Sequence, residues 1–188
     1  MRLDVYEKYL LFFICFFGIL LRYVNHSYDN LWYDEIISFW VANPDFSFQE
    51  TLNQNRLIED NSVTYNLILK YFFLVFGYSA ENGRLISVVC GSCSILTVGY
   101  LCRMLSKDRI YLFAIFLTSF NIYLISYSQE IRVYSMLFLF ASLNLIFFFK
   151  IINKNSIILS LGFAFSSIIL SSLHPFSLII FLSYALYL

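Results

Sequence analysis

The chain alternates between long apolar blocks and short polar connections. The apolar residues lack both the spacing of a soluble amphipathic helix and the alternation of a barrel strand, so they predict membrane helices. Each complete block is near the lower limit of about 17 residues for a spanning helix, and flanking Tyr and Trp residues extend it into the interface. A sixth block begins at residue 176, after five complete ones: residues 9–24, 85–101, 110–125, 133–149 and 157–173.

These blocks predict an all-α, polytopic helical membrane protein with about six transmembrane helices. We expect residues 1–188 to form one transmembrane module, with residues 25–83 as a long outer loop that carries juxtamembrane helices. Arg2 and Lys8 precede the first block, but no small-x-small cleavage site follows it. That block is therefore expected to be a retained helix and not a signal peptide.

Composition agrees with lipid as the solvent of this chain. Apolar residues make up 60% of it and charged residues 13%, whereas a soluble domain is about half apolar and about one quarter charged. The formal net charge is zero, so there is no overall attraction to nucleic acid, and no nucleic-acid partner is expected.

Small residues within the blocks have packing explanations. Cys90 and Cys93 form a CxxC spacing, but no second Cys or His pair lies near it in the sequence, and a free Cys packs as a small hydrophobe. Ser87 and Gly91 lie four residues apart on one helix face. Small residues let helices approach closely in lipid, so this face predicts a helix contact.

The distribution of Lys and Arg predicts the topology. Residues 64–77 are apolar but short, with Lys70 in the middle. If this segment does not cross the membrane, the other Lys and Arg clusters at the block ends fall on one side, which is the cytoplasm by the positive-inside rule. These clusters are Arg2 and Lys8, then Arg103, Lys107 and Arg109, then Lys150 and Lys154. We therefore predict an interfacial helix over 64–77, with Lys70 extending to the lipid headgroups.

This topology makes the protein an integral protein of the inner or plasma membrane, with a cytoplasmic N-terminus. It places most of the acids outside, where polar chemistry would be concentrated. In the outer loop, residues 34–42 and 48–57 predict short helices, with a turn at 43–45 between them. The nine outer acids are Asp29, Asp34, Glu35, Asp45, Glu50, Glu59, Asp60, Glu81 and Glu130.

Three polar clusters fall at the outer ends of the predicted spans. Asp34 and Glu35 follow the first block, and adjacent acids are also typical of a helix start. The second cluster contains Gln129, Glu130, Arg132 and Tyr134, in which the charged residues could form a structural ion pair. The third is His174-Pro175, and a lone His is commonly a hydrogen-bonded structural residue. Because all three clusters fall on one side, a shared site is the more specific hypothesis.

The order of these motifs resembles a known family. An aromatic-Asp-Glu step after the first span, a long outer loop, the stretch 76–87 with Gly77, Glu81, Arg84 and Ser87, and the second cluster follow in sequence. Together they resemble the N-terminal portion of protein-mannosyltransferase-like or aminoarabinose-transferase-like glycosyltransferases of the GT-C class. The resemblance implies a polyprenyl-phosphate sugar donor and an acceptor that is a glycan, a lipid or a protein.

The resemblance also implies roles for individual residues. Asp34 would be the catalytic carboxylate that accepts the proton of the acceptor hydroxyl, and Glu35 would position it or bind the acceptor. Arg132 or Arg84 would neutralise the lipid-phosphate leaving group. Substrate binding would also involve Gln129, Glu130 and Tyr134. Some family members use a divalent metal instead, for which the ligands here would be Glu59, Asp60 and His174.

Two departures from the family and one alternative accompany this expectation. The Pro-containing step before the interfacial helix is replaced by residues 59–65. Relatives usually run to several hundred residues with many more spans, so we expect the N-terminal part of a longer architecture whose activity in isolation is in question. The alternative is a non-catalytic membrane subunit or a component of a lipid-linked sugar flippase or polymerase. A flippase would place ionisable groups deep in the membrane, and the spans are expected to hold none, which favours the enzyme.

Overall fold

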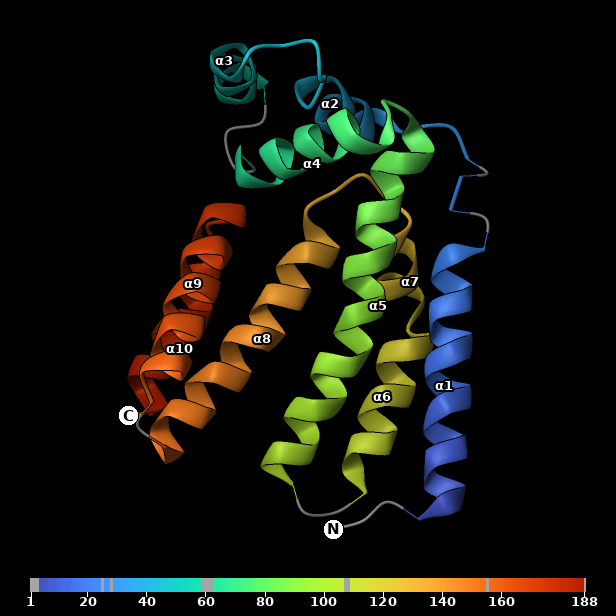
Figure 1. Ribbon diagram of the computed structural model, residues 1–188, viewed down its shortest axis with the longest axis vertical. Helices are drawn as coiled ribbons and strands as arrows, with labels where there is room; N and C mark the ends of the chain where they lie inside the picture. Colours follow the sequence, from blue (N-terminus) through green and yellow to red (C-terminus); the bar gives the residue numbers. More distant parts are fainter. Residues whose placement is uncertain are drawn as a thin grey trace.

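The structure is a computed structural model that describes residues 4–24, 26–27, 29–58, 63–106, 109–154 and 156–187. These residues form ten helices and no strand, which confirms the all-α prediction (Figure 1). The helices are α1 (Val5–Tyr23), α2 (Tyr33–Val41), α3 (Phe48–Ile58), α4 (Val63–Phe76), α5 (Ala80–Leu105), α6 (Ile110–Phe120), α7 (Ile122–Ser128), α8 (Tyr134–Asn153), α9 (Ile157–Leu173) and α10 (Ser177–Tyr187).

The long helices are those of a helical membrane protein. Among the described residues, α5 and α8 are long and apolar enough to cross a membrane, and α6 with α7 makes a third span if the two are counted together. Helices α9 and α10 are apolar but shorter. Helix α1 has 19 residues and carries Glu7, Lys8 and Arg22.

Helices α1, α5, α6, α8, α9 and α10 run more or less along the long axis of the molecule, whereas α2, α3 and α4 lie across one end (Figure 1). The transverse helices α2, α3 and α4 form a cap over the bundle (Figure 1). Helix α5 is central, because it packs against α8, α6 and α1. Since α1 runs toward the cap and α5 runs away from it, the long connection between them lies at that end of the bundle (Figure 1).

The cap has a buried apolar face. Tyr65, Leu69 and Phe73 recur along one side of α4 and are at most 2% exposed. They join a core cluster with residues of α5, the 129–133 connection, α8 and α9. The helix ends at Gly77, whose φ of 100° is a left-handed conformation that favours glycine. The predicted helices of the loop are thus confirmed, with boundaries shifted by one residue.

Lys70 does not extend to the lipid headgroups, contrary to the sequence-based expectation. Its side chain is 4% exposed, and its Nζ donates to Asn43 O at 3.1 Å, to Thr51 Oγ1 at 3.1 Å and to Phe46 O. An ammonium group can be buried when acceptors replace its water. The turn between α2 and α3 supplies these acceptors, so Lys70 fastens that turn to α4.

The predicted span over 110–125 is broken. Helix α6 ends at Phe120, and α7 begins at Ile122 after a bend of 55°. Asn121 has an extended backbone between them, and its side chain accepts a hydrogen bond from Leu124 N at 3.1 Å. An Asn at a helix start satisfies a backbone donor of the first turn. The second helix therefore begins with its own cap.

A buried arginine lies at the break between α6 and α7. Its position corrects the expectation that the spans hold no deep ionisable group. Arg22 is 1% exposed, and its guanidinium donates to Thr118 O at 2.7 Å, Ser119 O at 3.1 Å and Gly18 O at 2.8 Å. The first two carbonyls belong to the last turn of α6, where backbone acceptors lack helical partners. An ionisable group therefore does lie inside the bundle, and its bonds give it the role of a helix-end cap.

Candidate functional site

Three segments that are distant in the sequence meet beneath the cap. They are residues 26–27 and 29–32 with the first turn of α2, the first turns of α5, and the connection 129–133 between α7 and α8. Hydrogen bonds between side chains and backbone join all three. The first two predicted clusters are therefore brought together.

A buried ion pair forms the centre of this junction. Arg84 Nε donates to Glu35 Oε1 at 2.8 Å and its NH2 donates to Glu35 Oε2 at 2.7 Å. The two side chains are 5% and 1% exposed. Glu35 Oε1 also accepts from Ile131 N at 2.8 Å. Two parallel bonds between a guanidinium and a carboxylate fix orientation as well as charge, so Glu35 links all three segments.

Arg84 also orders the connection that precedes α2. Its NH1 donates to His26 O at 3.0 Å and Asp29 O at 2.8 Å, and its NH2 donates to Asn30 O at 3.3 Å. A guanidinium has five N–H groups, and these bonds, with those to Glu35, occupy each of its nitrogens. Arg84 therefore acts in this structure as a connector of backbone segments.

Asp34 lies beside Arg132, which is 98 residues away in the sequence. Arg132 NH1 donates to Asp34 O and to Ser38 Oγ, both at 3.1 Å. Its NH2 lies 3.8 Å from Asp34 Oδ2. The Asp34 side chain is 37% exposed, and that of Arg132 is 13% exposed. The guanidinium also lies over the Tyr134 ring, 5.7 Å from its centre. This carboxylate and this cation are thus adjacent at a partly open surface.

Gln129 has a structural position at the end of α1. Its Nε2 lies within hydrogen-bond distance of three acceptors, Leu21 O at 3.0 Å, Val24 O at 2.9 Å and Arg22 O at 3.3 Å. The last carbonyls of a helix lack intrahelical partners. The side-chain amide supplies them with a donor and joins α1 to the 129–133 connection.

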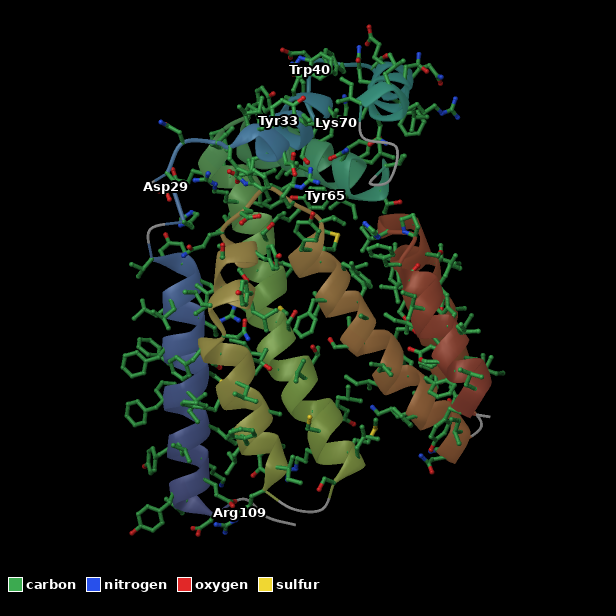
Figure 2. All side chains as sticks on the ribbon, turned by 180° about the vertical axis from the view of Figure 1, so that it is seen from behind. Asp29, Tyr33, Trp40, Tyr65, Lys70 and Arg109 are labelled. Carbon is green, nitrogen blue, oxygen red and sulfur yellow. The ribbon has the colours of Figure 1, made fainter. Side chains whose placement is uncertain are left out.

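A pocket of about 220 Å³ opens between the end of α1 and the 129–133 connection. Glu130 is in its wall, where Oε1 accepts from Ser126 Oγ at 3.3 Å. Burial raises the pKa of the Glu130 carboxyl above its ordinary value, and the negative charge of Glu35 also raises it, whereas the hydrogen bond from Ser126 and the charges of Arg132 and Arg84 offset part of the rise. Figure 2 shows Asp29 at the edge of the cap above α1. The lining residues are His26, Asp29, Asn30, Trp32, Glu35, Arg84, Ser126, Gln129 and Glu130.

Of the three predicted metal ligands, only His174 lies in the described part of the chain. Glu59 and Asp60 lie outside the described residues. His174 follows α9, and α9 lies on the side of the bundle opposite α1 (Figure 1). Its Nδ1 accepts from Phe176 N at 3.2 Å. Over the described ranges, no group of three or more His, Cys, Asp or Glu side chains could hold a metal ion.

Sequence reasoning missed His26 and Ser38 as parts of this region. Ser38 binds Arg132 from the second turn of α2, and His26 lines the pocket. His26 had a weak signal, because it is an ionisable residue directly after the first apolar block. Ser38 had none, since one turn of helix separates it from Asp34 and only the folded chain shows which face Arg132 approaches.

Comparisons with protein-family models, with curated proteins and with solved structures found no match to this chain. The resemblance described from the motifs therefore stays a prediction. Function has to be inferred from the geometry of the site, because function resides in particular side chains and not in the fold.

Proposed function

We propose that this protein is a membrane glycosyltransferase that moves a sugar from a polyprenyl-phosphate carrier to an acceptor. The supporting observation is the adjacency of Asp34 and Arg132, whose side-chain atoms lie 3.8 Å apart at a partly exposed surface. Transfer from a lipid phosphate needs a carboxylate to take a proton and a cation to neutralise the leaving group. These two residues offer both groups at one location.

The proposed reaction displaces the phosphate at the anomeric carbon of the sugar. Asp34 accepts the proton of the acceptor hydroxyl as its oxygen bonds to that carbon, and the bond from carbon to phosphate oxygen breaks. Arg132 neutralises the polyprenyl phosphate that leaves. The ring of Tyr134 and the backbone oxygen of Asp34 hold its guanidinium.

The family resemblance implied two possible roles for Glu35, to position Asp34 or to bind the acceptor. We assign it the positioning role. Both of its carboxylate oxygens accept hydrogen bonds from Arg84. Glu35 lies in the first turn of α2, directly after Asp34. Its neighbour Asp34 is thereby held in the first helical turn. Precise placement of a catalytic carboxylate matters because small displacements reduce rate strongly.

We also propose that the bundle crosses an inner or plasma membrane about six times, with the cap and Asp34 on the outer side. Support comes from the opposite end of the bundle, which holds Arg109 (Figure 2) and the ends of α5 and α8 with Arg103 and Lys150. Positive residues favour the cytoplasmic side. In this orientation the N-terminus lies on the cytoplasmic side.

One observation supports the alternative, a component of a lipid-linked sugar flippase or polymerase. Arg22 is an ionisable group inside the bundle, and such groups commonly mark transport pathways. However, its NH1 and NH2 groups bind backbone carbonyls at the end of α6 and in α1. This arrangement accounts for the arginine structurally, so we favour the enzyme.

The test uses the purified chain in lipid vesicles with radiolabelled polyprenyl-phosphate hexoses, and water serves as the surrogate acceptor. Asp34→Asn should reduce release of the labelled sugar by about 10² to 10⁴ fold, because an amide cannot accept the proton. Retention of the donor should be unchanged. Arg132→Ala should reduce both retention and release.

Asp45→Asn is the matched control, since Asp45 is an exposed acid of the same outer loop. It should behave as the wild type. Release by Asp34→Asn at the wild-type rate, or the absence of release from wild-type protein with every donor, would contradict the proposed activity.

A further inference from the structure

We propose that the pocket between the end of α1 and the 129–133 connection binds a primary ammonium group, carried by a small amine or by an aminated lipid headgroup. This inference does not depend on glycosyl transfer. It follows from the hydrogen-bonding groups that line the pocket and from the charges around it.

His26 supplies an unpaired acceptor. The ring is 5% exposed, and its Nδ1 lies 2.7 Å from Tyr23 O. A carbonyl oxygen can only accept, so Nδ1 carries the proton and Nε2 of the neutral ring is left as an acceptor. Nε2 is buried without a hydrogen-bond partner in the structure. A buried polar atom of this kind needs a ligand or a solvent molecule to offset its lost hydration.

Glu130 supplies the second unpaired acceptor. Its Oε1 accepts from Ser126 Oγ, whereas Oε2 is buried without a hydrogen-bond partner. The raised pKa of this carboxyl, caused first by burial, means that its negative charge lacks sufficient compensation. A cation that donates to Oε2 would supply that compensation.

The side-chain donors of Arg84, Ser126 and Gln129 in the pocket wall are already engaged. Arg84 donates to Glu35 and to three carbonyls. Ser126 donates to Glu130, and the side-chain amide of Gln129 donates to the end of α1. The interior therefore offers acceptors, and an anion would find no buried donor to bind it. A ligand with several N–H donors is complementary.

Charge favours a cation over a neutral polyol. The positive charge of Arg84 is matched by Glu35, so Asp29 and Glu130 remain as carboxyl groups of the pocket lining. Trp32 is also in the lining and is 46% exposed. The face of an indole ring attracts ammonium groups. The rim and the interior thus both favour positive charge.

The size and place of the pocket limit the ligand. Its volume of about 220 Å³ is below the range of about 300–1,000 Å³ typical of drug-sized ligands, so it suits a small headgroup. It lies where α1 ends at Tyr23, beneath the edge of the cap near Asp29 (Figure 2). A lipid headgroup and a soluble amine could both reach that level.

The experiment compares amines that differ only in methylation. Thermal unfolding of the purified chain in non-ionic detergent is followed during titration with ethanolamine or choline, which isolates the soluble source. Native mass spectrometry of protein from vesicles with equal amounts of phosphatidylethanolamine and phosphatidylcholine isolates the lipid source. The primary amine should bind about tenfold or more tightly in at least one arm, since the quaternary ammonium of choline has no N–H group to donate to Nε2 and Oε2.

Variants identify the pocket as the location. Glu130→Gln and Asp29→Asn should each weaken the preference for the primary amine by several fold, and Glu81→Gln, an exposed acid in the first turn of α5, should not. Because Asp29 is exposed, its variant keeps the test valid if Glu130→Gln does not fold. Equal binding of methylated and unmethylated ligands, full preference in both variants, or stabilisation by MgCl₂ in place of the amine would overturn the proposal. Sugar release is not measured, so failure of glycosyl transfer would leave this result unaffected.

Discussion

Glu35 and Arg84 form a buried ion pair with two hydrogen bonds, of 2.7 and 2.8 Å, that joins the first turn of α2 to the beginning of α5. Ile131 N adds the connection before α8 to the same carboxylate. Three segments at the cap end of the bundle therefore depend on one charge pair. Loss of one partner of this pair should destabilise the protein more than loss of a surface ion pair, because the remaining charge would stay buried without its partner.

Replacement of Glu35 by Gln should destabilise the protein strongly. The guanidinium would remain buried without its anion, and breaking a buried pair costs about 3–5 kcal/mol. The measurement is chemical or thermal unfolding in detergent. Glu81→Gln, on the exposed first turn of α5, is the matched control and should leave the unfolding midpoint unchanged. A Glu35→Gln protein as stable as the control would show that the pair does not hold the junction together.

Gly91→Leu should reduce the yield of folded protein. A Cβ at Gly91 would overlap Ser128 Oγ and lie 2.9 Å from Ser128 Cβ, which confirms the close contact predicted on this face of the helix. Overpacking a filled interior costs about 1–3 kcal/mol, and a leucine adds more volume than one methyl group. Val89→Leu, at a position 54% exposed, is the control. Equal folded yields in size-exclusion chromatography would refute the contact.

Glu130 should make stability depend on pH. Its pKa in the folded protein is raised above the ordinary value of 4.5, so the folded state holds a proton that the unfolded state releases first. Stability from this group is therefore present at low pH and is lost as the pH rises from about 4.5 through the folded-state pKa. Glu130→Gln should remove that part of the profile. Unfolding midpoints between about pH 4 and pH 8 measure the difference, and identical profiles for both proteins would contradict it.

Labelling with a membrane-impermeant maleimide should distinguish the two ends of the bundle. In a background without Cys15, Cys90, Cys93 and Cys102, Asp45→Cys should react in intact cells, whereas Arg109→Cys should react only after permeabilisation. The expectation follows from the positive residues at the end that holds Arg109. Labelling of position 109 from outside would invert the proposed orientation.

The helical architecture could be predicted from the sequence because local features decide it. Continuous apolar blocks require helices in lipid, where every backbone group needs an internal partner. The short helices of the connection between α1 and α5 were predicted on either side of the turn at 43–45 and over the short apolar segment 64–77, so α2, α3 and α4 were expected within one residue of their boundaries. The break in 110–125 was missed, because Asn121 alone does not end an apolar helix. In the folded chain α6 does end before Asn121, and Arg22 binds the carbonyl oxygens of Thr118 and Ser119 in the last turn of α6.

The sequence by itself determined that this is an all-α membrane chain whose acids gather in one long connection. It also brought Asp34, Glu35, Glu130 and Arg132 forward as candidates, since charge beside an apolar block is costly and therefore informative. Only the tertiary structure decided which charges pair: Arg84 with Glu35, and Arg132 with Asp34. It likewise decided that Lys70 is buried and that His26 lines a pocket. These outcomes depend on which acceptors the folded chain brings within hydrogen-bond distance, and residues 50 to 100 positions apart carry no local signal of that proximity.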